Sequence, residues 1–204
     1  MPKETFFNLP EKKQERVIEA AIEEFATYPF HKARITAIAD NAGIAKGSFY
    51  QYFKDKKDLY KYIIELTVEK KLTYINKEMM VNREKYNFFQ ILREIYLSGI
   101  RFAEENPRLI PIGFMLINDK KLYHEIFGEY KDQSSDFFQQ LLIQGKAKGD
   151  LDPAIDPVLV SKMLTSISYS LGDLIYEDGT LDMNDMEIID QMLHFIENGI
   201  KKRE

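Results

Sequence analysis

Residues 35–53 read ITAIADNAGIAKGSFYQYF, and this stretch decides the fold of the chain. The small residues Ala39 and Ala42 allow two short helices to cross closely, and Gly43 suits the positive φ at which the first helix ends. Ile44 then fills the corner between the two helices. The stretch therefore has the anatomy of a helix-turn-helix.

The second helix of this pair is expected to have one apolar and one polar face. Phe49 and Phe53 supply the apolar side that packs on the neighbouring helices. The opposite side carries Lys46, Gly47, Ser48, Tyr50, Gln51 and Tyr52. A lysine reaches guanine O6 and N7, a glycine allows close approach, and tyrosines contact phosphates or thymine methyl groups, so this face suits the major groove of DNA. The alternative is that both tyrosines are ordinary half-buried aromatic residues.

The segment 31–57 is basic within an acidic chain. It contains six Lys or Arg residues and two Asp, a local balance of +4. The other 22 basic residues face 31 acidic ones, a balance of −9, and the whole chain carries −5. A basic segment next to a groove-reading helix favours DNA contact, although a solvated loop or helix face would have the same charge.

Helical periodicity continues through the rest of the 204 residues, with no strand alternation and no internal repeat. Asp55 is expected to cap the helix that follows the helix-turn-helix, with Asp58 in its first turn. The fold class is therefore all-α, with about nine helices. They are expected over residues 10–27, 36–42, 45–53, 55–79, 88–105, 107–117, 120–146, 156–176 and 182–200.

Several classes of protein are excluded by composition. The chain has no cysteine, so it has neither disulfides nor thiolate metal sites. Its three histidines lack metal-binding spacing, and no nucleophile and base pair of an enzyme is visible, so we expect no metal, no cofactor and no catalysis. Without an apolar run of about 18 residues or a signal peptide, the chain is expected to be cytoplasmic and to have no membrane partner.

The residues around the helix-turn-helix resemble the DNA-binding region of TetR-type (tetracycline-repressor-like) transcriptional regulators. The resemblance covers residues 10–65 and rests on Glu19–Ala21, Glu24–Ala26, Ile38–Ala39, Ala42–Ile44 and Lys46–Leu59. It implies a three-helix DNA-binding domain over 1–54 and a helical effector-binding and dimerisation domain over 55–204. It also implies a ligand-released homodimeric repressor that binds a palindromic operator in double-stranded DNA.

The resemblance implies roles for individual residues. Lys46, Gly47, Tyr50 and Tyr52 fall where such regulators touch bases or the groove floor, and Ser48 and Lys56 fall at phosphate-contacting positions. One departure concerns the Ser or Thr that the family usually places just before its second helix, because Arg34 stands near that place and Thr36 slightly further on. The predicted DNA-contacting set is Arg34, Thr36, Lys46, Gly47, Ser48, Tyr50, Gln51, Tyr52 and Lys56.

The last two helices carry more apolar residues than one covered stripe requires. Two such helices from each of two subunits would form a four-helix interface, as the resemblance implies and as a palindromic operator needs. The alternative is that both stripes pack within one subunit. The predicted interface residues are Met163, Ile167, Leu171, Leu174, Ile189, Leu193 and Ile196.

The second half of the chain is rich in aromatic residues with few polar groups among them, which favours a small apolar or aromatic effector. For any single aromatic residue a place in the core is the alternative. The candidate pocket residues are Tyr96, Phe114, Asn118, Phe127, Tyr130, Tyr169 and Asp173. Two rival functions remain at this point, a helical small-molecule carrier and an interaction protein that does not use DNA.

Overall fold

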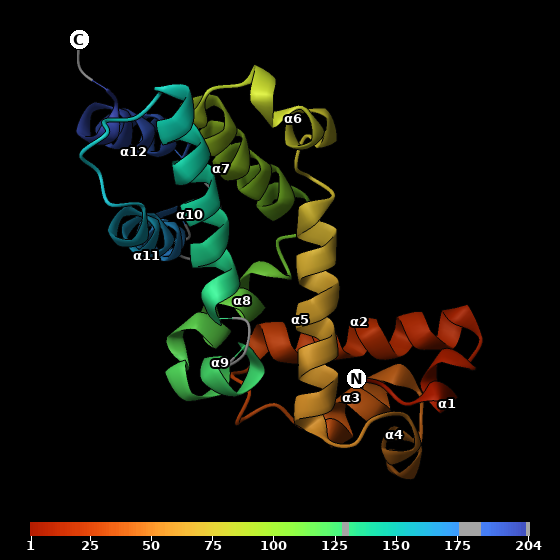
Figure 1. Cartoon of the computed structure of the whole chain (residues 1–204). Helices are drawn as coiled ribbons and strands as arrows, with labels where there is room; N and C mark the ends of the chain where they lie inside the picture. The colour runs from red at the N-terminus through yellow and green to blue at the C-terminus, as the bar shows by residue number, and fades with distance from the viewer. Residues whose placement is uncertain (128–130, 176–184, 203–204) are drawn as a thin grey trace. The chain divides into compact units, whose positions relative to one another are not determined.

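In the residues that it describes, the computed structural model consists of helices and the segments that connect them (Figure 1). It describes residues 1–127, 131–175 and 185–202, without the side chains of 131–135, 169, 172–175 and 185–186. In these residues the only extended pairing is an isolated bridge between Leu151 and Lys201, so the all-α prediction is confirmed. None of the described helices combines the length and the apolar character that crossing a membrane requires.

The chain forms two compact units. The first contains residues 1–72 and 106–126, with helices α1 (Glu4–Phe7), α2 (Glu11–Thr27), α3 (Ile35–Ala42), α4 (Lys46–Tyr52), α5 (Lys56–Leu72), α8 (Ile110–Asn118) and most of α9 (Lys120–Phe127). The second contains residues 73–105 and 127–204, with α6 (Lys77–Val81), the 3-10 helix η1 (Arg83–Lys85), α7 (Phe88–Glu105), α10 (Lys131–Lys148), α11 (Pro157–Ile175) and α12 (Asp185–Ile200). Helices α5 and α8 thus belong to the same unit as the helix-turn-helix, and both pack on α2.

The described residues form twelve α-helices, because two of the expected helices each correspond to two described helices and α1 is additional. The helix expected over 55–79 ends at Leu72, and Asn76 starts α6 by accepting the backbone N–H of Met79 on its side-chain oxygen at 3.1 Å. Such a side-chain cap competes with continuing the helix. Of the helix expected over 120–146, the structure describes α9 and the start of α10 onward, and residues 128–130 between them lie outside the described residues.

The core of the first unit is built from α2, α3, α4 and α5. It contains the fully buried side chains of Val17, Phe25, Ile38, Phe49, Phe53, Leu59 and Ile63. Tyr60 of α5 packs edge-on against Phe25, with ring centroids 4.8 Å apart. Its hydroxyl donates to the carbonyl oxygen of Ile112 at 3.2 Å, so α8 is tied to α5 by a buried hydrogen bond.

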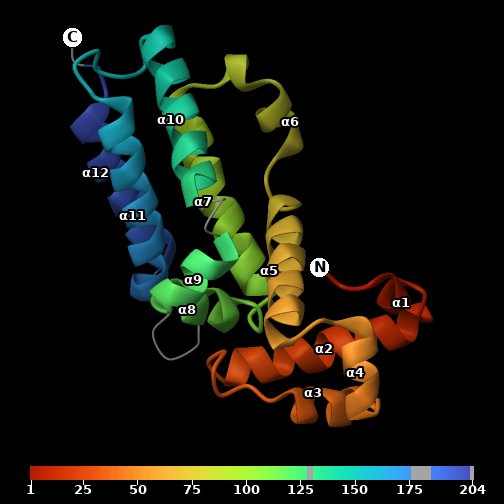
Figure 2. The same ribbon diagram turned by 60° about the horizontal axis from the view of Figure 1, so that its bottom comes forward.

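The second unit is a bundle of α7, α10, α11 and α12, which lie side by side in both views (Figures 1 and 2). Phe88, Leu92, Leu142, Leu164 and Ile189 are among its buried core residues. Tyr96 of α7 is buried there too, and its hydroxyl lies 3.0 Å from that of Ser168 on α11. Burial raises the pKa of Tyr96, and the hydrogen bond to Ser168 partly offsets that rise.

Candidate DNA-binding interface

One side of helix α4 packs on the rest of the first unit, and the other side is exposed. Phe49 and Tyr52 are buried, and the ring of Phe49 lies 5.4 Å from that of Phe53, the residue that follows the helix. The exposed side chains of the opposite face are those of Lys46, Tyr50 and Gln51, together with Gly47, while Ser48 is half-buried. This arrangement lets the free face approach a surface without disturbing the core.

The turn before α4 has the geometry expected of it. Gly43 ends α3 with φ at 66°, in the left-handed region that favours glycine. Its N–H donates to the carbonyl of Asp40 at 3.1 Å, and the N–H of Ile44 donates to that of Ala39 at 2.9 Å. These two bonds form a Schellman motif, and the burial of Ile44 completes it. The predicted helix-turn-helix is therefore confirmed in its details.

The start of α3 is held by two side chains from other helices. The backbone N–H of Arg34 donates to Oε1 of Glu24 at 2.7 Å, and the ammonium of Lys56 donates to the carbonyl of Ala33 at 2.7 Å. Burial lowers the pKa of Lys56, and the neighbouring Glu24 carboxylate partly offsets this shift. Lys56 is thus half-buried and supports the backbone before α3, whereas Arg34 and Thr36 are exposed.

The expectation that Tyr52 lies on the free face of α4 is wrong. The residue is only 6% exposed, and its ring packs 6.3 Å from that of Phe6 and beneath the ammonium of Lys13, 5.9 Å away. Tyr52 therefore serves α4 as an anchor. The physical reason is that α1, which the sequence reasoning did not anticipate, covers this side of the helix.

The basic side chains of the segment 31–57 differ in whether they form an ion pair. Lys46 and Lys54 are exposed, and the described residues offer neither of them an ion-pair partner. Lys57 pairs with Glu125 of α9, a contact that raises the pKa of Lys57 and lowers that of Glu125.

At the start of α5, Oδ1 of Asp55 accepts the N–H of Asp58 at 2.9 Å, which confirms the predicted cap.

The segment before α2 carries contacts that sequence reasoning missed. Lys3 donates to α4 twice, from its backbone N–H to the carbonyl of Tyr52 at 2.8 Å and from its ammonium to that of Tyr50 at 2.7 Å. The hydroxyl of Thr5 donates to the carbonyl of Gln51. The adjacent aromatic residues Phe6 and Phe7 were the available signal that this segment packs on the core.

Comparison with known proteins agrees with this geometry. The family model described as bacterial regulatory proteins of the tetR family matches residues 17–63, which include α3, α4 and the start of α5. The crystal structure of a TetR family transcriptional regulator from Chloroflexus aurantiacus J-10-FL has 33% sequence identity with this chain, covers 100% of both chains and superposes with a TM-score of 0.74. This chain belongs to the TetR family of transcriptional regulators. It is accordingly a DNA-binding regulator, and its family is made up of regulators rather than enzymes.

Two more distant relatives of this TetR-family chain span nearly its whole length. The fatty acid metabolism regulator protein of Bacillus subtilis is 22% identical over 189 residues, covering 89% of this chain and 96% of its own. The crystal structure of the regulator FadR from Bacillus subtilis in complex with stearoyl-CoA is 20% identical, covers 91% of this chain and 98% of its own, and has a TM-score of 0.71. The latter likeness is one of fold.

The candidate effector residues of this TetR-family chain lie in different places. Phe114, half-buried, and Asn118, exposed, belong to α8 in the first unit, whereas Tyr96 is buried in the second. Phe127 is half-buried at the end of α9. Tyr130 and the side chains of Tyr169 and Asp173 lie outside the described residues.

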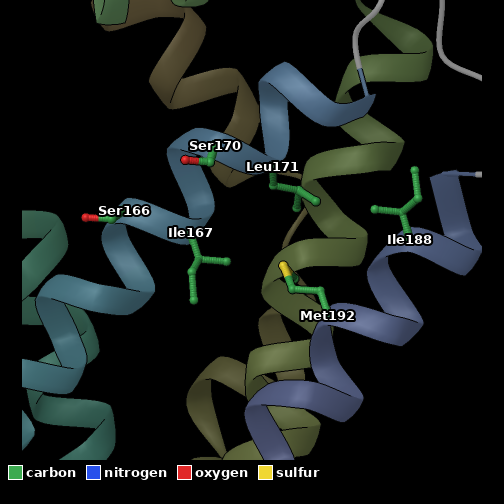
Figure 3. Close-up of a pocket in the computed structure, with 6 residues that line it drawn as sticks. All are labelled: Ser166, Ile167, Ser170, Leu171, Ile188 and Met192. Carbon is green, nitrogen blue, oxygen red and sulfur yellow. The ribbon is translucent and has the colours of Figure 1, made fainter.

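The described part of the second unit has an open apolar pocket of about 280 Å³ between α11 and α12. Ile167 and Leu171 of α11 and Ile188 and Met192 of α12 point toward one another across it, while the hydroxyls of Ser166 and Ser170 point away from α12 (Figure 3). Of the predicted effector residues whose side chains are described, none lines this pocket. Two predicted interface residues, Ile167 and Leu171, do.

The apolar stripes of α11 and α12 are divided between the core and the surface. Leu171, Ile189 and Ile196 are at most 7% exposed and belong to the core of the second unit, so they leave little surface for a second subunit to contact. Met163 is 53% exposed, and Ile167 and Leu193 are half-buried. The side chain of Leu174 lies outside the described residues. Exposed apolar residues of these two helices that the sequence reasoning did not assign to the interface are Val158, Leu159 and Phe195.

Proposed function

We propose that this TetR-family regulator is a homodimeric repressor that binds a palindromic operator and is released by an apolar effector. The observation that carries the proposal is the free face of α4, where Lys46, Gly47, Tyr50 and Gln51 are exposed above a side anchored by buried aromatic rings. Two such helices, one from each subunit, would enter major grooves about one helical turn, roughly 34 Å, apart.

Within this proposal, Lys46 reads guanine, and Tyr50 and Gln51 contact neighbouring bases or thymine methyl groups. Because Gly47 has no side chain, the backbone of α4 can approach the groove closely at this residue. Arg34, Thr36 and Ser48 bind phosphates, and Lys56 contributes by holding the residue before α3 as well as by its charge. DNA binding is assigned to residues 1–54, and effector binding and dimerisation to 55–204, in a cytoplasmic protein without catalytic activity.

The proposed subunit interface is formed by the exposed apolar side chains of α11 and α12. Leu159, Met163 and Phe195 are 57%, 53% and 74% exposed, and the apolar pocket lies between the same two helices. A second copy of the chain would cover these side chains, with the same patch of each subunit facing the other. Removing this much apolar surface from water favours the dimer.

The proposed effector is a small molecule that is mainly apolar. The related FadR of Bacillus subtilis has been crystallised with stearoyl-CoA. The core of the second unit of this chain consists of aliphatic and aromatic side chains. An effector releases DNA only by as much as its affinity differs between the DNA-bound and the released conformation, about 1 to 3 kcal/mol in typical cases.

The test is selection of duplexes from a randomised DNA pool by the purified protein. The selected duplex and a scrambled one are then titrated by fluorescence anisotropy at two salt concentrations. A palindrome bound about a thousandfold more tightly than the scrambled duplex is expected. Weak binding without sequence preference, in a protein that is dimeric, would instead favour a carrier or an interaction protein. Long-chain acyl-CoA, free CoA and an aromatic acid, added to the complex, then test the effector class.

A further inference from the structure

The C-terminal end of α4 is completed by a segment 40 to 50 residues away in the chain. The last four carbonyl groups of any helix lack partners within the helix. In α4 the first of these, that of Phe49, accepts the N–H of Phe53 at 2.9 Å. The other three, on Tyr50, Gln51 and Tyr52, all accept hydrogen bonds from Lys3 or Thr5.

The segment that supplies these donors is itself anchored in the core. Phe6 is fully buried, and its ring lies 4.9 Å from that of Phe53 and 5.8 Å from that of Tyr62 on α5. Figures 1 and 2 both show α1 beside α4. Lys3 and Thr5 are therefore presented to the end of α4 by a fixed element.

Helix α4 needs such support because it is short. It has seven residues, and isolated helices shorter than about 12 residues are marginal in water. The ammonium of Lys3 adds a positive charge at the helix C-terminus, where the helix dipole favours it. Loss of these donors would let the last turn of α4 open, and the side chains on its free face would lose their fixed directions.

We propose that Lys3 and Thr5 are positioning residues of the DNA-binding site, which cap α4 and thereby set the affinity for the operator. This inference rests on the proposed function, since it assigns to the two residues an effect on operator recognition through α4. It differs from a direct role, in which the ammonium of Lys3 would bind a phosphate of the DNA.

The two roles make different predictions for binding. A phosphate contact adds affinity for every sequence, and losing it lowers the slope of log affinity against log salt by about 0.9. A positioning residue affects the selected duplex far more than the scrambled one and leaves that slope unchanged. Removal of one cap hydrogen bond is expected to weaken operator binding about five- to tenfold.

The experiment compares Thr5→Val, Lys3→Met and Lys3→Arg with the unchanged chain. Thr27→Val and Lys12→Ala are the matched controls, since the hydroxyl of Thr27 bonds within α2 to Glu23 and Lys12 is exposed on the same helix. Binding to the selected and the scrambled duplex is measured as a function of salt. Amide hydrogen exchange over residues 46–53 is measured without DNA, with the thermal midpoint recorded for each variant.

We expect Thr5→Val and Lys3→Met to bind the operator five- to tenfold more weakly, with unchanged scrambled-duplex affinity and salt slope. Their α4 amides should exchange several-fold faster, and Lys3→Arg should restore both properties because it keeps the donor and the charge. Equal loss on both duplexes with a lower slope, or unchanged exchange in α4, overturns the inference. If the unchanged chain selects no duplex, the proposed function fails, and the exchange of α4 still shows whether the cap exists.

Discussion

The backbone N–H of Arg34 donates a 2.7 Å hydrogen bond to Oε1 of Glu24, a carboxylate that is only 5% exposed. The bond joins the last turn of α2 to Arg34, the residue that directly precedes α3. Since Arg34 is itself a proposed phosphate contact, a core residue of α2 fixes the backbone of a residue at the DNA surface.

Replacing Glu24 should therefore affect both stability and DNA binding. Glu24→Leu leaves the N–H of Arg34 without its acceptor, which costs about 1 to 3 kcal/mol of the free energy of unfolding. Glu24→Gln keeps an acceptor oxygen and is expected to lose much less. Urea unfolding and anisotropy with the selected duplex measure the two effects. If the Gln variant loses as much as the Leu variant, the charge near Lys56 is what matters, and not the hydrogen bond.

Lys46→Ala should weaken binding to the selected duplex about tenfold to a hundredfold, because one lost base contact costs about 1 to 3 kcal/mol of discrimination. Binding to the scrambled duplex should fall much less. Lys57→Ala is the matched control, since it removes a charge from the same basic segment but from a residue already paired with Glu125. Equal losses of Lys46→Ala on both duplexes would show that Lys46 contacts phosphate only.

Gly47→Ala should separate stability from DNA binding. A Cβ at this position meets nothing within 4 Å, so alanine is tolerated and should stabilise the fold by about 0.5 to 1 kcal/mol. Affinity for the selected duplex should nevertheless fall, because the added methyl group stands on the face proposed to approach the groove. The comparison is Gly43→Ala, which should destabilise by about 1 to 2 kcal/mol owing to its positive φ. Undiminished affinity in Gly47→Ala would argue against close approach at this residue.

Stability should decline in alkaline solution, with Tyr60 as one cause. Burial raises the pKa of Tyr60, and the nearby Asp119 adds to the shift. Because the pKa of Tyr60 is higher in the folded than in the unfolded chain, folding stabilises its neutral form. This contribution to the free energy of unfolding is complete below about pH 10, where the unfolded tyrosine ionises, and is lost as the pH rises above that value. Tyr60→Phe should lose about 1 kcal/mol at pH 7 through its missing hydrogen bond to Ile112 but show a shallower alkaline decline.

Urea midpoints between pH 8 and 11 measure this decline. The exposed Tyr28 provides the control Tyr28→Phe, which should follow the unchanged chain throughout. Some alkaline decline should remain in Tyr60→Phe, because burial also raises the pKa of Tyr96 in the second unit. Identical pH profiles for Tyr60→Phe and the unchanged chain would remove Tyr60 as a cause.

Phe195→Glu should convert the proposed dimer to a monomer without unfolding it. Phe195 is 74% exposed, so the substitution costs the isolated unit little, but a charge buried at an apolar interface is strongly unfavourable. Sedimentation equilibrium gives the molar mass. Val81→Glu, at a position 79% exposed on α6, should remain dimeric. A dimeric Phe195→Glu variant would place the subunit interface elsewhere.

The helix-turn-helix was predictable because its determinants are close together in the chain. Helix α3 ends through bonds that Gly43 and Ile44 donate to residues three and five positions before them, and Asp55 caps α5 through a residue three positions on. Local geometry of this kind depends on residue type and spacing, which a sequence displays directly.

The roles of Tyr52, Lys56, Leu171 and Ile189 were decided by tertiary structure. An apolar or basic residue at helical spacing belongs to a recognisable face, but the sequence does not say what covers that face. In the folded chain Tyr52 packs against α1, and the ammonium of Lys56 donates to the carbonyl of Ala33. Ile189 is buried in the core of the second unit.

The sequence by itself thus determined the all-α fold, the helix-turn-helix and the family of regulators to which the chain belongs. Only the tertiary structure decided which side of α4 is free, which apolar residues of α11 and α12 remain exposed, and that Lys3 and Thr5 complete the end of α4. The physical reason is distance along the chain. Capping and helical periodicity act within a few residues, whereas burial and the partners of polar groups depend on segments that only folding brings together.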